Sequence, residues 1–153
     1  MKEIICLKNN TMLNNEGIKA LEMNEKYFHE NFRSMILEKV DYFSTTIFKK
    51  KIPILSYCNH EKWWELYRRL YNSQDKAPPV QKYILNSNLS VIDWDLIIFD
   101  PSVKDFIKAR NDVVGVKNTI TVLIQNSENL STFTFGTKKN KAYLKKLIFC
   151  SFL

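Results

Sequence analysis

The sequence predicts an α/β fold: an α-β-α sandwich with a central five-stranded antiparallel sheet flanked by helices. The spacing of apolar residues changes from three or four residues to two near Asp41 and again near Val116, which indicates strands after helices. The predicted strands come as hairpins with helices between them, so helices are expected on both faces of the sheet. The 153 residues include only three Gly and four Pro, and 13% are aromatic, so the chain can bury one sizeable core.

The N-terminal part is expected to hold a loosely ordered arm over residues 1–14, rich in Asn and Lys, and a helix over residues 16–40. Apolar residues at helical steps predict one buried face of this helix: Ile18, Leu21, Phe28, Phe32, Met35, Ile36 and Val40. No linker or repeat follows, so residues 15–153 are expected to form a single domain.

Two hairpins supply most of the predicted sheet. Residues 42–48 and 52–57 are dense in aromatic and β-branched side chains and flank a turn of three lysines. Pro53 lacks a backbone donor, so the strand that contains it is expected at a sheet edge or to begin there. Residues 116–124 and 130–137 form the second predicted hairpin because apolar and polar residues alternate along them.

Helices and one short strand fill the remaining segments. Asn59 is predicted to be the N-cap of a helix that continues to Tyr71. Asp100 and Pro101 are typical of the N-cap and the first position of another helix. The other expected elements are a short helix after Ala77-Pro78-Pro79, a short strand over residues 89–94 and a final helix over residues 141–153.

Charge and composition exclude several classes of protein. The net charge is +7, but the basic residues form short scattered clusters that are typical of a solvated surface. No apolar run reaches the roughly 18 residues of a membrane helix, and the N-terminus lacks the apolar segment of a signal peptide. Three cysteines far apart in the sequence do not predict a disulfide framework. We therefore expect a cytoplasmic domain with no membrane partner.

No pattern in the sequence predicts an enzyme. The Gly-x-Ser-x-Gly, phosphate-loop and His-Glu-x-x-His motifs are absent. Asp93 and Asp95 are interpreted as a solvated turn rather than an acid–base pair. Cys58 and His60 supply only half of the four ligands that a structural zinc site needs. We expect no catalytic residue, no metal and no cofactor.

The helix predicted after Asn59 carries an unusual aromatic face. His60, Trp63, Trp64 and Tyr67 share one side of it, so imidazole, indole and phenol groups are expected to converge. Such side chains combine apolar bulk with one polar tip, which suits a pocket for a small amphipathic ligand. Ordinary core packing, with the polar tips bonded to the backbone, accounts for the same pattern.

Several local patterns also occur together in one known family. They are Asp41-Tyr42-Phe43-Ser44, Asn59-His60-x-x-x-Trp64-x-x-Tyr67, Ala77-Pro78-Pro79-Val80, Trp94 before a helix, Gly115-Val116-x-x-x-Ile120-Thr121, and Leu130-Ser131-Thr132-Phe133-Thr134-Phe135. In their order and spacing, residues 40–137 resemble the N-terminal autoinducer-binding domain of LuxR-type quorum-sensing regulators. PAS and GAF sensor domains share the predicted layout.

The resemblance implies a set of ligand-binding residues. Trp64 matches the family Trp that donates to the lactone carbonyl of an acyl-homoserine lactone, and Tyr67 lies on the same helix face. His60 stands where the family usually has a Tyr that contacts the amide carbonyl, and Thr134 matches a last-strand Ser or Thr that often does so. Trp94 matches a Trp of the pocket wall.

One residue departs from the family pattern. The family has an Asp directly before the first Pro, where it accepts the amide N–H of the ligand, but this chain has Ala77 there. Asp75, two residues upstream, is the nearby carboxylate that can replace it. Either Asp75 takes this role, or the ligand is not an acyl-homoserine lactone.

These observations favour a LuxR-like sensor domain that binds a small amphipathic signal molecule. It is expected to act as a homodimer or as a heterodimer with a related regulator. The chain stops at Leu153 in the last predicted helix, so we expect neither the family's helix-turn-helix domain nor direct DNA binding. A ligand-free interaction module that dimerises with or inhibits a partner regulator is the alternative, and a basic nucleic-acid-binding protein ranks below it.

The missing Asp predicts weak binding of acyl-homoserine lactones. Ala77→Asp should raise lactone affinity by about tenfold to a hundredfold, because a hydrogen bond to a charged acceptor contributes about 1.5–3 kcal/mol. Calorimetric titration of both proteins with short- and long-chain lactones measures this difference. Tight binding by the unmodified chain would contradict the prediction and favour Asp75 as the acceptor.

Overall fold

The computed structural model describes residues 39–71, 78–97 and 100–152. Its elements are β1 (Tyr42–Lys49), β2 (Ile52–Cys58), α3 (Glu61–Leu70), α4 (Pro79–Leu85), β3 (Val91–Asp93), the 3-10 turn η1 (Trp94–Leu96), α5 (Pro101–Val114), β4 (Asn118–Gln125), β5 (Asn129–Thr137) and α6 (Lys141–Phe152). The predicted arm over residues 1–14 and the predicted helix over 16–40, except for its last two residues, lie outside the described residues. Within the described part of the chain, no helix is long and apolar enough to cross a membrane.

The five strands form one antiparallel sheet in the order β2-β1-β5-β4-β3. The predicted fold class is therefore confirmed. β2 is an edge strand, as Pro53 predicts, and the register with β1 shifts beside this residue, between Ile47 and Phe48. β1 and β5 pair along their whole length without a shift, so they fix which side chains face which layer.

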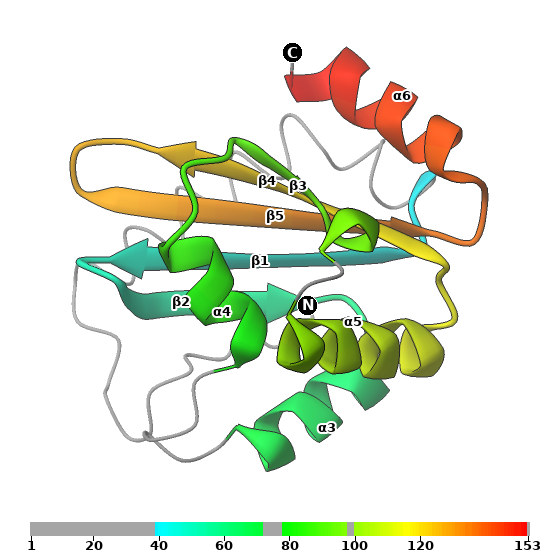
Figure 1. Cartoon of the computed structure of the whole chain (residues 1–153), viewed down its shortest axis with the longest axis horizontal. Helices are drawn as coiled ribbons and strands as arrows, with labels where there is room; N and C mark the ends of the chain where they lie inside the picture. The colour runs from blue at the N-terminus through cyan, green and yellow to red at the C-terminus, as the bar shows by residue number, and fades with distance from the viewer. Residues whose placement is uncertain (1–38, 72–77, 98–99, 153) are drawn as a thin grey trace.

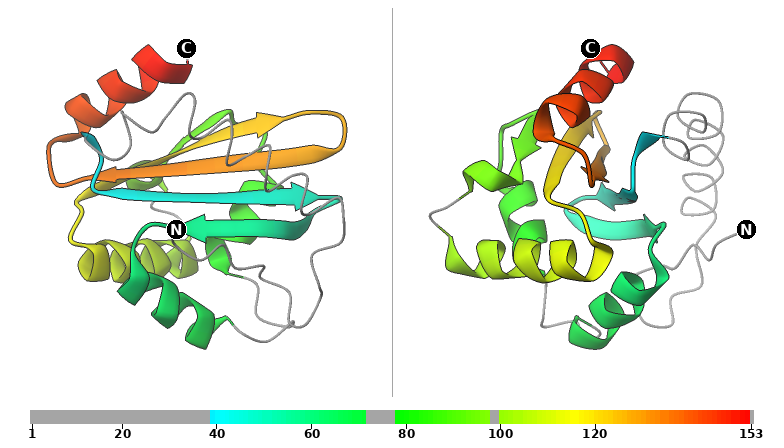
Figure 2. Two further views of the ribbon diagram at one scale, coloured as in Figure 1. Left: turned by 180° about the vertical axis from the view of Figure 1, so that it is seen from behind. Right: turned by 90° about the vertical axis from the view of Figure 1, so that its right-hand side faces the viewer.

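Helices cover both faces of the sheet. Figures 1 and 2 show α3, α4 and α5 on one side and α6 on the other. Leu144 and Ile148 of α6 pack with Phe133 and Phe135 of β5, and with the apolar residues of β1 and β4 on that face. The opposite face packs against a larger cluster to which α3, α4 and α5 contribute Trp63, Ile84, Val103, Phe106 and Ile107.

Ion pairs attach α6 to the end of β3. Lys141 Nζ lies 2.8 Å from Asp93 Oδ2 and 3.0 Å from Asp95 Oδ2, and Lys145 Nζ lies 3.7 Å from Asp93. The side chain of Asp93 is only 11% exposed, so the interpretation as a solvated turn is wrong for Asp93, whereas Asp95 is exposed and lies in the turn η1. The same ion pairs neutralise part of the basic charge that a nucleic-acid site would use.

Two helices begin at side chains that bond to the backbone. Asp100 accepts hydrogen bonds from the backbone N–H groups of Ser102 and Val103, which confirms the predicted cap of α5. α3 differs from the prediction by one residue, because its N-cap is His60 and not Asn59. The amide oxygen of Asn59 instead accepts from the backbone N–H of Phe43 at 2.9 Å, so it ties β2 to β1.

Gly136 leaves the space that its neighbours need on the sheet face covered by α3, α4 and α5. A Cβ atom there would lie 3.1 Å from both Tyr42 Cβ and the Thr119 methyl group, and 3.2 Å from a Val116 methyl group. We expect Gly136→Ala to lower the free energy of unfolding by about 1–3 kcal/mol, because overpacking of a tight site strains its surroundings. Denaturant unfolding measures the change.

The Thr119→Ser substitution provides a matched test of the same contact. It removes the Thr119 methyl group and keeps the hydroxyl, so it should recover part of the lost stability in the Gly136→Ala background. An unchanged free energy of unfolding in Gly136→Ala alone would show that the site has room for a side chain.

Candidate functional site

A small cavity lies between the sheet and helices α3, α4 and α5. Its sheet side, called here the hydroxyl floor, consists of Ser44, Thr46, Ser56, Thr132 and Thr134. These residues share one face because side chains alternate along a strand, and the register places Ser44 opposite Thr134 and Thr46 opposite Thr132. A buried sheet face is usually apolar, so a floor of hydroxyl groups is a distinctive surface.

Aromatic side chains form the opposite wall, the aromatic roof, which consists of Trp63, Trp64, Tyr67 and Phe106. The rings of Trp64 and Tyr67 stack with centroids 5.5 Å apart, and the Trp63 ring meets Phe106 edge-on at 5.4 Å. Packing around the partly exposed Tyr67 removes water from its phenol and so raises the pKa of this group. The roof therefore offers large apolar area with few free polar atoms.

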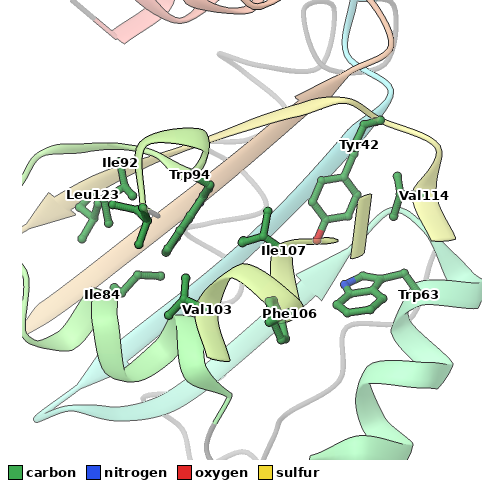
Figure 3. Packing of buried hydrophobic residues seen from close by; sticks show 12 residues of the cluster. Tyr42, Trp63, Ile84, Ile92, Trp94, Val103, Phe106, Ile107, Val114 and Leu123 are labelled. Atoms are coloured by element: carbon green, nitrogen blue, oxygen red, sulfur yellow. The ribbon is translucent and has the colours of Figure 1, made fainter. Parts of the chain in front are cut away.

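Trp94 and Thr134 belong to one buried hydrogen-bond chain. The indole Nε1 of Trp94 donates to Thr121 Oγ1 at 2.8 Å, and Thr121 Oγ1 shares a hydrogen bond of 2.7 Å with Thr134 Oγ1. The Trp94 donor is thus satisfied within the protein. Trp94 serves as a wall of the cavity, at the opposite end of the cluster from Tyr42 and Trp63 (Figure 3).

Trp64 differs from Trp94 in this respect. Its Nε1 is buried, and no acceptor among the described residues bonds to it. Trp64 is also one of the residues that line the cavity. A buried N–H without a partner reduces stability by roughly 1–3 kcal/mol.

A second polar group lies at the end of the cavity formed by Tyr42, Ser44 and Cys58. Arg110 of α5 is 4% exposed, and its Nη2 donates to the hydroxyl of Thr119. Its guanidinium carbon lies 5.5 Å from the centre of the Tyr42 ring. Burial raises the pKa of Tyr42 well above its usual range, so this residue is a neutral phenol at physiological pH.

Four of the six predicted site residues line the cavity: Trp64, Tyr67, Trp94 and Thr134. His60 is placed outside its lining, because the imidazole Nδ1 accepts the backbone N–H of Trp63 at 3.3 Å as the cap of α3. Asp75, like Ala77 next to the predicted break, lies outside the described residues. The described part of the chain contains no group of three His, Cys, Asp or Glu side chains placed to hold a metal ion.

Sequence reasoning missed Arg110 and the residues of the hydroxyl floor other than Thr134. The alternation in residues 42–48 and 130–137 places Ser44, Thr46, Thr132 and Thr134 on one face, so the floor was within reach of the sequence. Arg110 follows Val103, Phe106 and Ile107 at helical spacing and so interrupts the apolar side of α5.

The fold described above is shared with solved structures of the VqsR ligand-binding domain and of SdiA. The VqsR ligand-binding domain of Pseudomonas aeruginosa has 15% identity and a TM-score of 0.53, with 90% of this chain and 90% of that chain covered. A structure of SdiA in complex with octanoyl-rac-glycerol has 15% identity and a TM-score of 0.50. Escherichia coli SdiA in a second structure has 15% identity and a TM-score of 0.48.

The matches to the two SdiA structures cover nearly all of this chain but only part of each SdiA chain. The match takes in 92% and 93% of this chain but only 64% and 59% of the SdiA chains, so this chain spans about three fifths of their length. No family model and no curated protein sequence matches the chain. At 15% identity the likeness establishes the fold, and the chemistry of the site has to be argued from the residues of this chain.

We expect the indole N–H groups of Trp64 and Trp94 to contribute differently to the stability of the free protein. Trp94→Phe breaks its bond to Thr121, so a double-mutant cycle with Thr121→Val should show coupling of about 1 kcal/mol. The matched cycle of Trp64→Phe with Thr121→Val should be additive, because Trp64 Nε1 bonds to no described residue. Denaturant unfolding of the parent protein and of the single and double variants measures both cycles. Equal coupling in the two cycles would contradict this assignment.

Proposed function

We propose that this chain is a ligand-sensing domain that binds a small amphipathic signal molecule non-covalently in the cavity between the hydroxyl floor and the aromatic roof. The observation that carries the proposal is the buried Nε1 of Trp64 in the cavity wall, which has no acceptor among the described residues. A ligand acceptor placed beside this indole would satisfy the donor. The rest of the molecule would then lie between the rings of the roof and the hydroxyl groups of the floor.

The composition of the two walls supports an amphipathic ligand. Hydroxyl groups donate and accept, so Ser44 and Thr134 on paired strands suit a headgroup with both kinds of polar atom. The aromatic roof suits an acyl chain or another apolar body. SdiA, whose fold this chain shares, is known in complex with octanoyl-rac-glycerol, a molecule with an eight-carbon acyl chain and a polar head.

The size of the cavity bears on how a ligand would act on the domain. Its volume is about 70 Å³, which is room for about two water molecules, whereas ligand pockets usually measure about 300–1,000 Å³. Binding therefore requires the roof to move away from the floor. α3 carries three of the four residues of the roof, and α5 carries Phe106. Both helices contact the sheet through side chains rather than through a shared ladder of backbone hydrogen bonds.

Such a rearrangement provides the signal. A ligand that binds only the opened form shifts the population toward it and stabilises the folded chain by mass action. We propose that the opened form differs in how it pairs with a second copy of the chain or with a related regulator.

The same small volume favours a second candidate function, a ligand-free interaction module whose cavity is filled by its own aromatic side chains. In that case the side chains of the roof serve only as core, and the protein acts through its surface. Added amphipathic molecules would then leave its stability unchanged.

We expect octanoyl-rac-glycerol, used as a probe, to raise the melting temperature of the protein by several degrees at about one hundred times its dissociation constant, which corresponds to about 2.7 kcal/mol. Trp64→Phe should weaken binding by roughly tenfold, because it removes the donor. Trp94→Phe is the matched control and should weaken binding less, since Thr121 already occupies that donor. Thermal shift and calorimetry measure these effects. No stabilisation by any amphipathic probe would favour the interaction module.

A further inference from the structure

Arg110 is a buried cation with which no carboxylate in the described part of the chain forms an ion pair. Its side chain is 4% exposed and lines the cavity. The side chains beside it are the Thr119 hydroxyl that accepts from Nη2, the Tyr42 ring and the Cys58 thiol. The Nε donor has no partner among the described residues, none of whose carboxylates forms an ion pair with this guanidinium.

The nearest acidic residues along the helix do not supply the missing charge. Asp105 and Asp112 of α5 are exposed, on the side away from the cavity. Tyr42 cannot supply it either, because burial raises the pKa of the phenol. Burial also acts against the charged form of Arg110 and lowers the pKa of the guanidinium, yet an arginine remains protonated in proteins.

An arginine in this setting is built to receive an oxyanion. Its planar fork offers parallel N–H donors that match the two oxygens of a carboxylate. An anion paired with it inside a low-dielectric cavity interacts more strongly than in water, and it also satisfies the free Nε. Lysines on the surface of the same chain, such as Lys108 on α5, are solvated and give no such selectivity.

We propose that the signal molecule is an amphipathic carboxylate whose carboxylate group pairs with Arg110, while its apolar part lies under the aromatic roof. This inference rests on the proposed function and specifies the headgroup of its ligand. It predicts that neutral molecules of the same shape, such as amides and glycerol esters, bind more weakly than the corresponding acid.

The test compares octanoate with octanamide, which have the same chain length and differ in the charge of the headgroup. Calorimetric titration of the wild-type protein near pH 7.5, where octanoate is ionised, should give at least tenfold tighter binding of octanoate. Arg110→Met should abolish this preference and Arg110→Lys should keep part of it. Lys108→Met removes one positive charge from the exposed side of the same helix and should leave the preference unchanged.

Each outcome decides between the possibilities. Equal or tighter binding of octanamide by the wild type overturns the inference and leaves the proposed function intact. A preference for octanoate that survives in Arg110→Met also overturns it, because another cation then binds the acid. If the wild type binds neither probe nor octanoyl-rac-glycerol, the proposed function fails as well. If Arg110→Met does not fold, the wild-type comparison and Arg110→Lys still decide the question.

Discussion

The burial of a hydroxyl-bearing sheet face under aromatic rings is the constraint on which the rest of this structure depends. Burying a hydroxyl group without a hydrogen-bond partner is unfavourable, and side chains on neighbouring strands provide such partners here. Thr46 bonds to Ser56 at 3.1 Å, Thr121 bonds to Thr134 at 2.7 Å, and Trp94 completes the second chain from above. The other face of the same sheet is apolar and packs against α6 in the usual way. The two faces therefore differ in kind, and the polar one holds the cavity.

Among the described residues, this arrangement leaves two cavity donors unmatched in the free protein, Trp64 Nε1 and Arg110 Nε. Each reduces the stability of the free state, and a ligand that supplied acceptors to both would provide the missing hydrogen bonds. The indole lies in the roof and the guanidinium beside Tyr42, so in the proposed function they would contact two points of a ligand, with apolar contact between them. Because the cavity of the free chain measures about 70 Å³, the proposed ligand would bind together with an opening of the roof. In the proposed function, sensing would follow from packing, since the bound and free forms would differ in structure.

Alternation and capping carried enough information to predict most of the fold. Period-two patterns identified β1, β4 and β5, Pro53 placed β2 at an edge, and Asp100 marked the start of α5. The cap of α3 was misplaced because Asn59 and His60 are both good acceptors, and the choice depends on Phe43, whose backbone N–H, 16 positions away, bonds to Asn59.

The site likewise depends on contacts between residues that are far apart in the sequence. Trp64 and Trp94 were both expected to line a pocket, but only the partner Thr121, 27 positions from Trp94, shows that one donor is occupied. Arg110 interrupts an apolar helix face in the sequence, yet only the assembled strands and helices show that no described carboxylate pairs with it.

Native mass spectrometry of the protein purified from its natural source tests the central claim most directly, because it detects a bound molecule whose identity is unknown. The account predicts a main species heavier than the chain by the mass of one small organic molecule, which is lost when the same sample is denatured. It also predicts that this molecule has an apolar part and a polar head. A species of the chain mass alone under both conditions, unchanged after incubation with an organic extract of the source cells, would contradict the claim that the cavity is a ligand site.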